Sequence, residues 1–358
     1  MYTIMDLLKP QVLTTSYSRR KALRPLMLTS DFYKTPENVD GNEATLFFDP
    51  EEQTPAPGNV PGSSARILEL GDATEKRIGL FYAFNKIILK DDIMHALREP
   101  ESSSLQQMAR TEIDRQLSRF RWRHQINKEQ TFGKILFDGK VYLDNQGRVL
   151  ESSSGAVITA DMGVAAGHQG DVGGIFAALW STPATSIQDQ LERLKNKASE
   201  DGVEEPTEIY VDAVNKRHLR ANTEFKAWAQ AHQELSREVL RGSMLPDLWG
   251  FNWHFIGGHY VNTSGTKSPF ASTTKGLICP APAASGWIRA TAGSNHVPTS
   301  IEIKTDALAL LSNLTTLYGE FAYASLSHDP VALNMFMGDK YGLHFADPGA
   351  VWQPTLFA

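Results

Sequence analysis

The apolar positions between residues 77 and 84 follow a period of two. The two alternating sets are Ile78, Leu80, Tyr82 and Phe84 on one side and Arg77, Gly79, Phe81 and Ala83 on the other. This spacing predicts a β-strand, because successive side chains of a strand point to opposite faces. Both faces carry apolar residues. Two interpretations follow: one face meets a partner, or the strand belongs to an ordinary hairpin packed on the chain's own core.

The segment before this strand is dense in residues that break helices. These breakers are Pro55, Pro57, Gly58, Pro61 and Gly62. Such a stretch favours extended backbone, because proline fixes φ and removes a backbone donor. Residues Pro55–Lys90 are therefore predicted to form a projecting arm that continues into a ribbon.

From Ser102 onward the apolar residues recur every three to four positions. The apolar face comprises Leu105, Ala109, Ile113, Leu117, Phe120 and His124, and the other faces carry Gln106, Arg110, Asp114, Arg119 and Arg123. This pattern predicts an amphipathic helix of roughly 20 to 25 residues within Ser102–Gln130. The serines at 102 to 104 supply its N-cap, because a hydroxyl accepts a hydrogen bond from the first turn.

The rest of the chain alternates between short strands and helices. Gly133–Glu151 predicts β-hairpins at two turn signals, and Ser152–Gly174 predicts a loop. A helix begins after Ser186, whose hydroxyl is expected to cap the first turn. The further predicted elements are a buried strand at Glu208–Asp212, helices at Val214–Ala221 and Thr223–Arg241, and strands at Trp249–Val261 and Gly276–Cys279.

Composition narrows the class of protein. The 358 residues are 41% hydrophobic and 21% charged, which suits one large or two linked globular domains. The net charge of -6 argues against binding nucleic acid through bulk positive charge. A single cysteine, Cys279, cannot form an internal disulfide and fits a reducing cytoplasm. We expect no signal peptide and no membrane partner, because no apolar run approaches the ~20 residues that a bilayer requires.

The motifs that could carry chemistry are weak. His254 and His259 lie five apart on a predicted strand, which places them on opposite faces and argues against a shared metal. Ser272 and Lys275 match the S-x-x-K pattern of acylating serine enzymes, but S-D-N and K-T-G companions are missing from the sequence. The glycines near 170 form neither a dinucleotide fingerprint nor a phosphate loop. We therefore expect no catalytic residues, no metal and no cofactor.

Several short motifs, in this order along the chain, resemble the lambda-type major capsid proteins of tailed phages, the phage capsid protein E family. They are Arg110-Thr111-Glu112, Gly139-Lys140, Asp161-Met162-Gly163 and Trp180 before the capped helix, with a weaker match at Gly257-Gly258-His259-Tyr260 and Gly276-Leu277-Ile278. The resemblance extends from about Leu23 to the end of the chain.

This resemblance implies an α+β protein with the HK97-like fold of tailed-phage capsids. That fold has an extended β loop, a long spine helix, and peripheral and axial domains. The implied division is an N-terminal arm at 1–50, the extended loop at 51–100, the spine helix with the hairpin part of the peripheral domain at 101–180, the axial domain with peripheral elements at 181–325, and a C-terminal return segment at 326–358.

The function implied by the resemblance is structural. Copies of the chain would form hexamers and pentamers that close into an icosahedral shell around a double-stranded DNA phage genome. The implied partners are other copies, scaffold, portal and decoration proteins, and packaged DNA in weak contact. The arm and ribbon would lie across a neighbouring subunit. The residues expected at the subunit interface are Arg77, Phe81, Tyr82, Phe84, Arg110, Arg119 and Arg123.

Two alternatives stay open at the level of sequence. One is a nanocompartment shell of the encapsulin type, which has the same fold but encloses cargo enzymes. The other is a two-domain cytoplasmic enzyme whose nearest candidate site residues are Asp161, His168 and His259.

Overall fold

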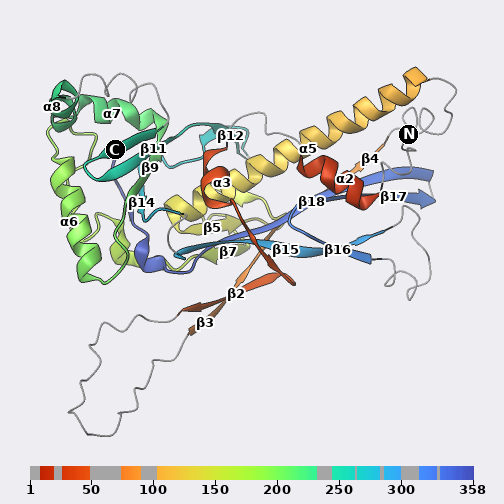
Figure 1. Ribbon diagram of the computed structural model, residues 1–358, viewed down its shortest axis with the longest axis horizontal. Coiled ribbons are helices and arrows are strands. Elements are labelled where there is room, and N and C mark those ends of the chain that lie inside the picture. The colour runs from red at the N-terminus through yellow and green to blue at the C-terminus, as the bar shows by residue number, and fades with distance from the viewer. Residues whose placement is uncertain are drawn as a thin grey trace, which may run out of the picture.

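A six-stranded sheet and one long helix form the centre of the molecule (Figure 1). The computed structural model describes residues 9–19, 26–48, 74–89, 103–231, 244–262, 264–282, 286–299, 314–328 and 331–358. Four strands of the sheet lie in the order β1 (Glu37–Val39), β15 (Ile288–Pro298), β18 (Val331–Phe345), β17 (Phe321–His328). The other two are β16 (Leu314–Tyr318), which pairs with β15, and β4 (Phe81–Ile88), which pairs with β18. Strand β18 is thus the central strand.

The long helix α5 (Ser103–Asp138) has 36 residues, which corresponds to about 54 Å at 1.5 Å per residue. It lies on one face of the sheet, and the short helices α2 (Pro10–Ser18) and α3 (Met27–Phe32) pack beside it (Figure 1). Ile113 and Leu117 of α5 share a core cluster with Met335 and Met337 of β18. Of the predicted apolar face, Ile113, Leu117 and His124 are buried and Phe120 is half-buried, whereas the side chains of Leu105 and Ala109 lie outside the described part of the structure.

Helix α5 is longer than the sequence pattern predicted. The β-hairpin expected to begin at Gly133 is wrong, because the helix continues to Asp138. Residues 131–138 are helical and nearly all buried, so their apolar side chains show no amphipathic period. The helix ends at the predicted turn signal, where Gly139 has φ +66° and donates its N–H to the carbonyl of Ile135 at 3.0 Å.

The second turn signal does form a hairpin. Strands β5 (Lys140–Leu143) and β6 (Val149–Leu150) are joined by a turn in which Gly147 has φ +73°. Asp144 fixes this turn by accepting hydrogen bonds from the backbone N–H groups of Gln146 and Arg148. The segment expected to be a loop after residue 152 contains strand β7 (Ile158–Asp161), which pairs with β5, followed by η1 (Ala166–His168) and β8 (Gln169–Gly170).

A second unit packs at the C-terminal end of α5. Its sheet has the order β10 (Met244–Leu248), β11 (Phe251–Ile256), β9 (Glu208–Asp212), β14 (Leu277–Cys279), and α6 (Ile187–Glu200), η2 (Ala213–Asn215), α7 (Lys216–Ala221) and α8 (Thr223–Ala231) surround it (Figure 1). The small hairpin β12 (His259–Val261) and β13 (Lys267–Pro269) completes it. The predicted cap of α6 is confirmed, because the Ser186 hydroxyl accepts the N–H of Asp189 at 3.4 Å.

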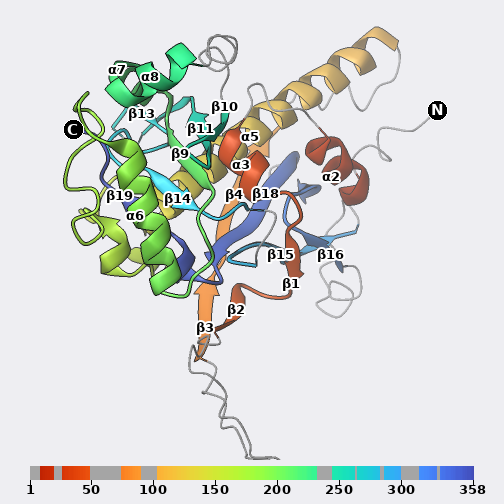
Figure 2. The same ribbon diagram turned by 60° about the vertical axis from the view of Figure 1, so that its left-hand side comes forward.

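The predicted ribbon divides between two places. Strand β3 (Thr74–Gly79) pairs with β2 (Glu43–Phe48) in a two-stranded ribbon that extends away from the body (Figure 2). Strand β4 instead pairs with β18 of the same chain along its whole length. The expectation that all of Pro55–Lys90 projects is therefore wrong for residues 81–88. The predicted arm at 55–62 lies outside the described residues.

The C-terminal segment returns through the middle of the molecule. After β18 and η3 (Pro348–Ala350), β19 (Gln353–Pro354) pairs with β8, and Trp352 exchanges both backbone hydrogen bonds with Ile278. The Gln353 side chain donates to the carbonyls of Ile135 and Leu136 at the end of α5. The division of the chain into domains stays a prediction.

Among the described helices, none combines the length and the apolar character that crossing a membrane would require.

Candidate assembly surfaces

The outer part of the large sheet, formed by β4, β18 and β17, has two contrasting faces. One face packs on α5 and α2 through small and flexible side chains, which include Ala322, Ala324, Met335 and Met337. Strand register places the side chains opposite these on the other face, since successive residues alternate.

Aromatic side chains fill the second face. Rings from the three strands stack in a continuous layer, which comprises Tyr82, Phe84, Phe321, Tyr323 and Phe336. Their planes lie within 26° of one another, and the shortest centroid distance is 4.8 Å between Tyr323 and Phe336. We call this layer the aromatic face. Tyr82 is 53% exposed and Phe84 42% exposed, whereas Phe321 is only 2% exposed. Ile88, 62% exposed, lies on the same face beyond Lys86, whose ammonium lies over the Phe336 ring.

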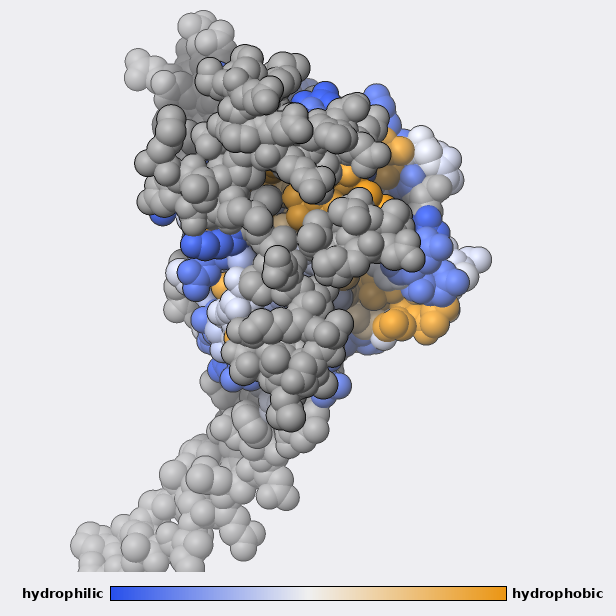
Figure 3. Space-filling view, turned by 90° about the vertical axis from the view of Figure 1, so that its right-hand side faces the viewer, coloured by the Kyte–Doolittle hydropathy of each residue, from blue (hydrophilic) through white to orange (hydrophobic). Residues whose placement is uncertain are grey.

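The end of the molecule that carries these strands shows some hydrophobic residues at the surface (Figure 3). Exposed apolar side chains that gather on one face mark surfaces that meet another molecule. The aromatic face is therefore the first candidate assembly surface.

A layer of buried polar groups lies between α5 and the sheet. Lys128 and Asp339 form an ion pair of 2.6 Å in which both side chains are buried, and the ammonium also lies over the rings of Tyr33 and Tyr341. Arg121 pairs with Glu320 at 3.4 Å. Burial raises the pKa of the Glu320 carboxyl, and the charge of Asp339 raises it further. This layer fixes the helix to Asp339 of β18 and to Glu320, which lies between β16 and β17.

His124 joins three elements in the same layer. Its Nδ1 shares a 2.6 Å hydrogen bond with the Tyr17 hydroxyl of α2, and its Nε2 accepts from the Asn85 amide of β4 at 2.7 Å. An amide nitrogen can only donate, so the imidazole is neutral and carries its proton on Nδ1. Burial lowers the pKa of His124 to about 4, which agrees with a neutral ring.

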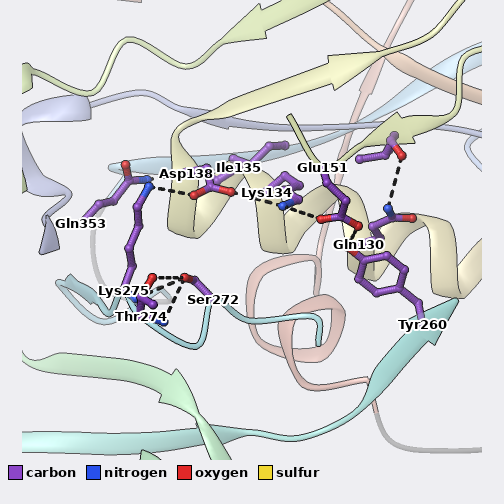
Figure 4. Close-up of polar contacts among 11 residues, drawn as sticks. Gln130, Lys134, Ile135, Asp138, Glu151, Tyr260, Ser272, Thr274, Lys275 and Gln353 are labelled. Carbon is purple, nitrogen blue, oxygen red and sulfur yellow. Dashed lines mark hydrogen bonds and ion pairs between the residues drawn. The ribbon is translucent and has the colours of Figure 1, made fainter. Parts of the chain in front are cut away.

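A polar seam connects the C-terminal turns of α5 to the second unit (Figure 4). Lys275 contacts Asp138 at 2.8 Å, Lys134 contacts Glu151 at 3.0 Å, and the Tyr260 hydroxyl donates to Glu151 at 2.6 Å. Lys134 and Asp138 lie four residues apart on one side of the helix.

The helix and the second unit approach closely at Gly133. A Cβ atom there would collide with the backbone carbonyl oxygen of Phe270. Phe132, Ile135 and Leu136 pack into one core cluster with Phe270 and other residues of the second unit. The two units therefore share a rigid apolar joint with a polar rim.

Comparison with known proteins identifies the family. A sequence model described as phage major capsid protein E matches residues 10–303, more than four fifths of the chain. The chain belongs to the phage major capsid protein E family. A search of curated protein sequences found no match.

Solved structures show the same fold at low sequence identity. A crystal structure described as a prophage capsid protein of E. coli CFT073 is 13% identical, with a TM-score of 0.54 over 98% of this chain and 99% of that chain. A phage-related protein of Bordetella bronchiseptica RB50 is 10% identical, with a TM-score of 0.52 over 97% of both chains. The likeness to the prophage capsid protein confirms the HK97-like capsid fold predicted from sequence.

Family membership also decides between the functions left open by the sequence. The protein is a major capsid protein, a structural component of the phage head that assembles with copies of itself, and its location is the virion. It is not an enzyme, and the phage capsid is favoured over a cellular nanocompartment. The prediction of a structural function is confirmed.

The S-x-x-K motif of this capsid protein forms no catalytic pair. The Lys275 ammonium contacts Asp138, and the Ser272 hydroxyl accepts the backbone N–H of Lys275 at 3.1 Å (Figure 4). The motif is a local turn whose lysine belongs to the seam. The S-x-x-K pattern therefore has a structural role and no catalytic one.

The candidate residues of the enzyme hypothesis have separate partners. Asp161 pairs with Lys140, His168 stacks on Trp352 at 3.6 Å, and His259 lies exposed on β12. His254 lies on a different strand, β11, and contacts Glu208 at 2.6 Å. Within the described part of the chain, no group of three or more His, Cys, Asp or Glu residues is arranged to hold a metal ion.

The residues expected at the subunit interface fall into four groups. Tyr82 and Phe84 lie on the aromatic face, and Arg119 and Arg123 are exposed on α5. Phe81 is only 7% exposed and stacks on Tyr341 in the chain's own core, so its assignment to the interface is corrected.

The side chains of Arg77 and Arg110 lie outside the described part of the structure. Sequence analysis missed Phe321, Tyr323 and Phe336, although Phe-x-Tyr at 321–323 carries the period of a strand with an aromatic face.

Proposed function

We propose that the capsid protein assembles as hexamers and pentamers into an icosahedral shell that encloses a double-stranded DNA genome, and that the aromatic face is buried against a neighbouring copy. The observation that supports this most directly is the stack of Tyr82, Phe84 and Phe336 on the sheet face opposite α5. Each large aromatic side chain stabilises a contact by roughly 1.5 to 3 kcal/mol when it is fully buried.

The proposed occupant of the aromatic face is the β2–β3 ribbon of the neighbour. The ribbon extends away from the body of its own chain (Figures 1 and 2). Strands β2 and β3 pair only with each other among the described strands, so the ribbon's stability on its own is marginal. Docking on a neighbour's sheet would bury it.

The same ribbon-to-sheet contact, repeated between all copies, is enough to hold a shell together. A ribbon on one surface and a receiving face on another form a heterologous contact, which closes into a ring when the rotation between copies permits. Once a ring has closed, each subunit is held by two contacts, so individually weak interfaces give a stable particle. Hexamers and pentamers differ in that rotation, and the ribbon is the segment proposed to accommodate the difference.

We also propose contacts for two exposed arginines of α5 and for partners other than copies of the chain. Arg119 and Arg123, exposed on the outer half of α5, are proposed to contact a neighbouring subunit. Scaffold, portal and decoration proteins are the proposed further partners. The net charge of -6 favours only weak contact with the packaged DNA, because binding to the phosphate backbone depends on released counterions.

Two substitutions on the aromatic face test the proposal. Phe84→Ala and Ile88→Ser remove exposed apolar side chains. Phe84 also stacks on Tyr82, Phe321 and Phe336 in the free subunit, so thermal unfolding of each variant is measured beside the particle count. We expect folded, soluble protein whose yield of closed particles, counted by electron microscopy, falls at least tenfold, since each 1.4 kcal/mol lost per contact is a factor of ten.

Ile158→Ser is the matched control. Ile158 is also an exposed isoleucine on a strand, 55% exposed, but it lies on β7 in the small three-stranded sheet. We expect particles at wild-type yield from this variant. Wild-type yields from both Phe84→Ala and Ile88→Ser, or equal losses from Ile158→Ser, would refute the role of the aromatic face.

A further inference from the structure

Strand β17 is the outermost strand of its part of the sheet. It pairs with β18 on one side, and no described strand pairs with its other side. In an antiparallel pair the backbone groups of alternate residues point to opposite sides of the strand. The N–H and C=O groups of Ala322 point outward, because both bond to Thr14 of α2. By alternation, the backbone groups of Ala324, Leu326 and His328 point to the same outer edge.

The hydroxyl of Thr14 takes the place of a strand at this edge. It donates to the carbonyl oxygen of Ala322 at 3.0 Å and accepts the N–H of the same residue at 3.0 Å. A partner strand in an antiparallel sheet would make the same two bonds to Ala322. One side chain of a helix therefore occupies one rung of the ladder and prevents pairing there.

Helix α2 depends on its docking against β17 and α5. It has nine residues, and a helix of that length is marginal in water unless it is docked. Leu13 and Tyr17 are its buried side chains in the core cluster with Ala322 and Ala324, and the Tyr17 hydroxyl bonds to His124. Loss of these contacts would release the helix as a unit.

An uncovered edge strand is a template for pairing with another chain, and proteins protect such edges. We propose that α2 guards the β17 edge in the free subunit, and that its displacement during assembly lets a strand of a second copy pair with that edge. A second copy is the occupant because the protein assembles with copies of itself, and because this edge borders the aromatic face through Phe321 and Tyr323. The guard would prevent pairing before subunits meet in the correct arrangement.

This inference is independent of the proposed role of the aromatic face. It concerns the backbone edge of β17 and the N-terminal helix, and it requires only that shells form. If Phe84→Ala shells assembled normally, the guard could still be tested. If the guard failed its test, the aromatic face would be unaffected.

Residue-resolved hydrogen exchange on the wild-type protein, before and after assembly, is the first test. The outward amides to follow are those of Ala324, Leu326 and His328, and the inward amides that bond to β18 serve as an internal control in Tyr323, Ser325 and Ser327. We expect the outward amides to exchange at least tenfold more slowly in shells, the α2 amides to exchange faster, and the control amides to stay unchanged. Unchanged protection of α2 together with unprotected outward amides in shells would overturn the proposal.

A matched pair of valine substitutions is the second test. Thr14→Val removes both bonds to Ala322 and keeps the shape of the side chain. Thr15→Val is the control, because the Thr15 hydroxyl bonds only within its own helix, to the carbonyl of Gln11 at 2.7 Å. Light scattering would follow assembly, and thermal unfolding would report the stability of the free subunit.

The direction of the effect separates a guard from a permanent support. We expect Thr14→Val to shorten the lag of assembly at least threefold while Thr15→Val matches wild type. Slower assembly by Thr14→Val, or wild-type kinetics from both variants, would overturn the guard. If Thr14→Val failed to fold, the exchange measurement on wild-type protein would still decide the question.

Discussion

The two parts of helix α5 are fixed to the molecule in different ways. The outer part, through Lys128, packs one apolar side on the sheet through Ile113 and Leu117, and otherwise depends on a buried polar layer. The inner part, from Thr131 to Asp138, is buried mainly by apolar residues, with Lys134 and Asp138 in the polar seam on one side. The same helix thus has one end held by a small number of directional contacts and another held by close packing.

This difference predicts which substitutions and which changes of pH destabilise each part of the helix. Close packing depends on volume and shape, and it tolerates changes in charge state elsewhere. Buried polar contacts depend on charge and protonation, because each partner that is removed leaves the other unsatisfied in a low dielectric. The outer part should therefore be sensitive to charge and pH, and the inner part to added volume.

The largest expected effect lies in the outer part. Lys128→Met removes the partner of Asp339 and leaves a carboxylate buried near Glu320. Breaking a buried ion pair in this way costs about 3 to 5 kcal/mol in the free energy of unfolding. Chemical denaturation of the unassembled protein would measure it. The double variant Lys128→Met with Asp339→Asn should recover part of the loss, and a double variant as unstable as the single one would contradict the ion-pair explanation.

A smaller effect is expected in the inner part from one added methyl group. Gly133→Ala places a Cβ against the backbone of Phe270, which cannot move away as a flexible side chain could. Overpacking of this kind costs about 1 to 3 kcal/mol, of which about 1 is offset by the better helix propensity of alanine. Because the added Cβ would overlap a backbone oxygen, the cost lies at the upper end of that range, and we expect a net loss of about 2 kcal/mol in chemical denaturation.

Gly167→Ala is the control for this prediction, because a Cβ added at Gly167 would have no atom within 4 Å and the φ of this residue is not in the left-handed region. It should leave stability within about 0.5 kcal/mol of wild type. Equal stability of Gly133→Ala and wild type would show that the joint is looser than the close packing implies.

Sequence patterns predicted the elements whose signals are local. The cap at Ser186, the apolar face of α6 and the turn at Gly147 each depend on residues within a few positions of one another. The end of α5 could not be predicted in this way. Residues 131–138 are buried except around Lys134 and Asp138, and the turn signal at Asp138-Gly139 favoured a hairpin over two further helical turns.

The aromatic face could be predicted only in part. Tyr82 and Phe84 were expected at an interface because their strand has apolar residues on both faces. Their neighbours Phe321 and Phe336 come from strands more than 230 residues away in sequence, and pairing between such distant segments leaves no local signal. For the same reason the pattern could not show that β4 pairs with β18 and buries Phe81.

The smallest expected effect that distinguishes the two parts of the helix is the dependence of the free energy of unfolding on pH. The pKa of His124 is lowered from 6.5 to about 4 by burial, with the charge of Lys128 lowering it and that of Asp339 opposing this. Tyr17 and Asn85 complete its surroundings. The folded state therefore binds a proton less readily than the unfolded state, and the stabilising contribution of the neutral ring is fully present above pH 6.5.

As pH falls from 6.5 toward 4, that contribution is lost, at a limit of about 1.4 kcal/mol per pH unit, which amounts to about 2 kcal/mol by pH 5. Carboxyls such as Glu129, whose pKa burial raises, act in the opposite direction and are common to all variants. The measurement is the difference between wild type and His124→Gln in the free energy of unfolding at pH 7, 6 and 5. The difference should shrink by about 2 kcal/mol across this range, because glutamine does not titrate. A difference that stays constant with pH would mean that His124 titrates alike in both states, and that the outer part of α5 is held by packing as the inner part is.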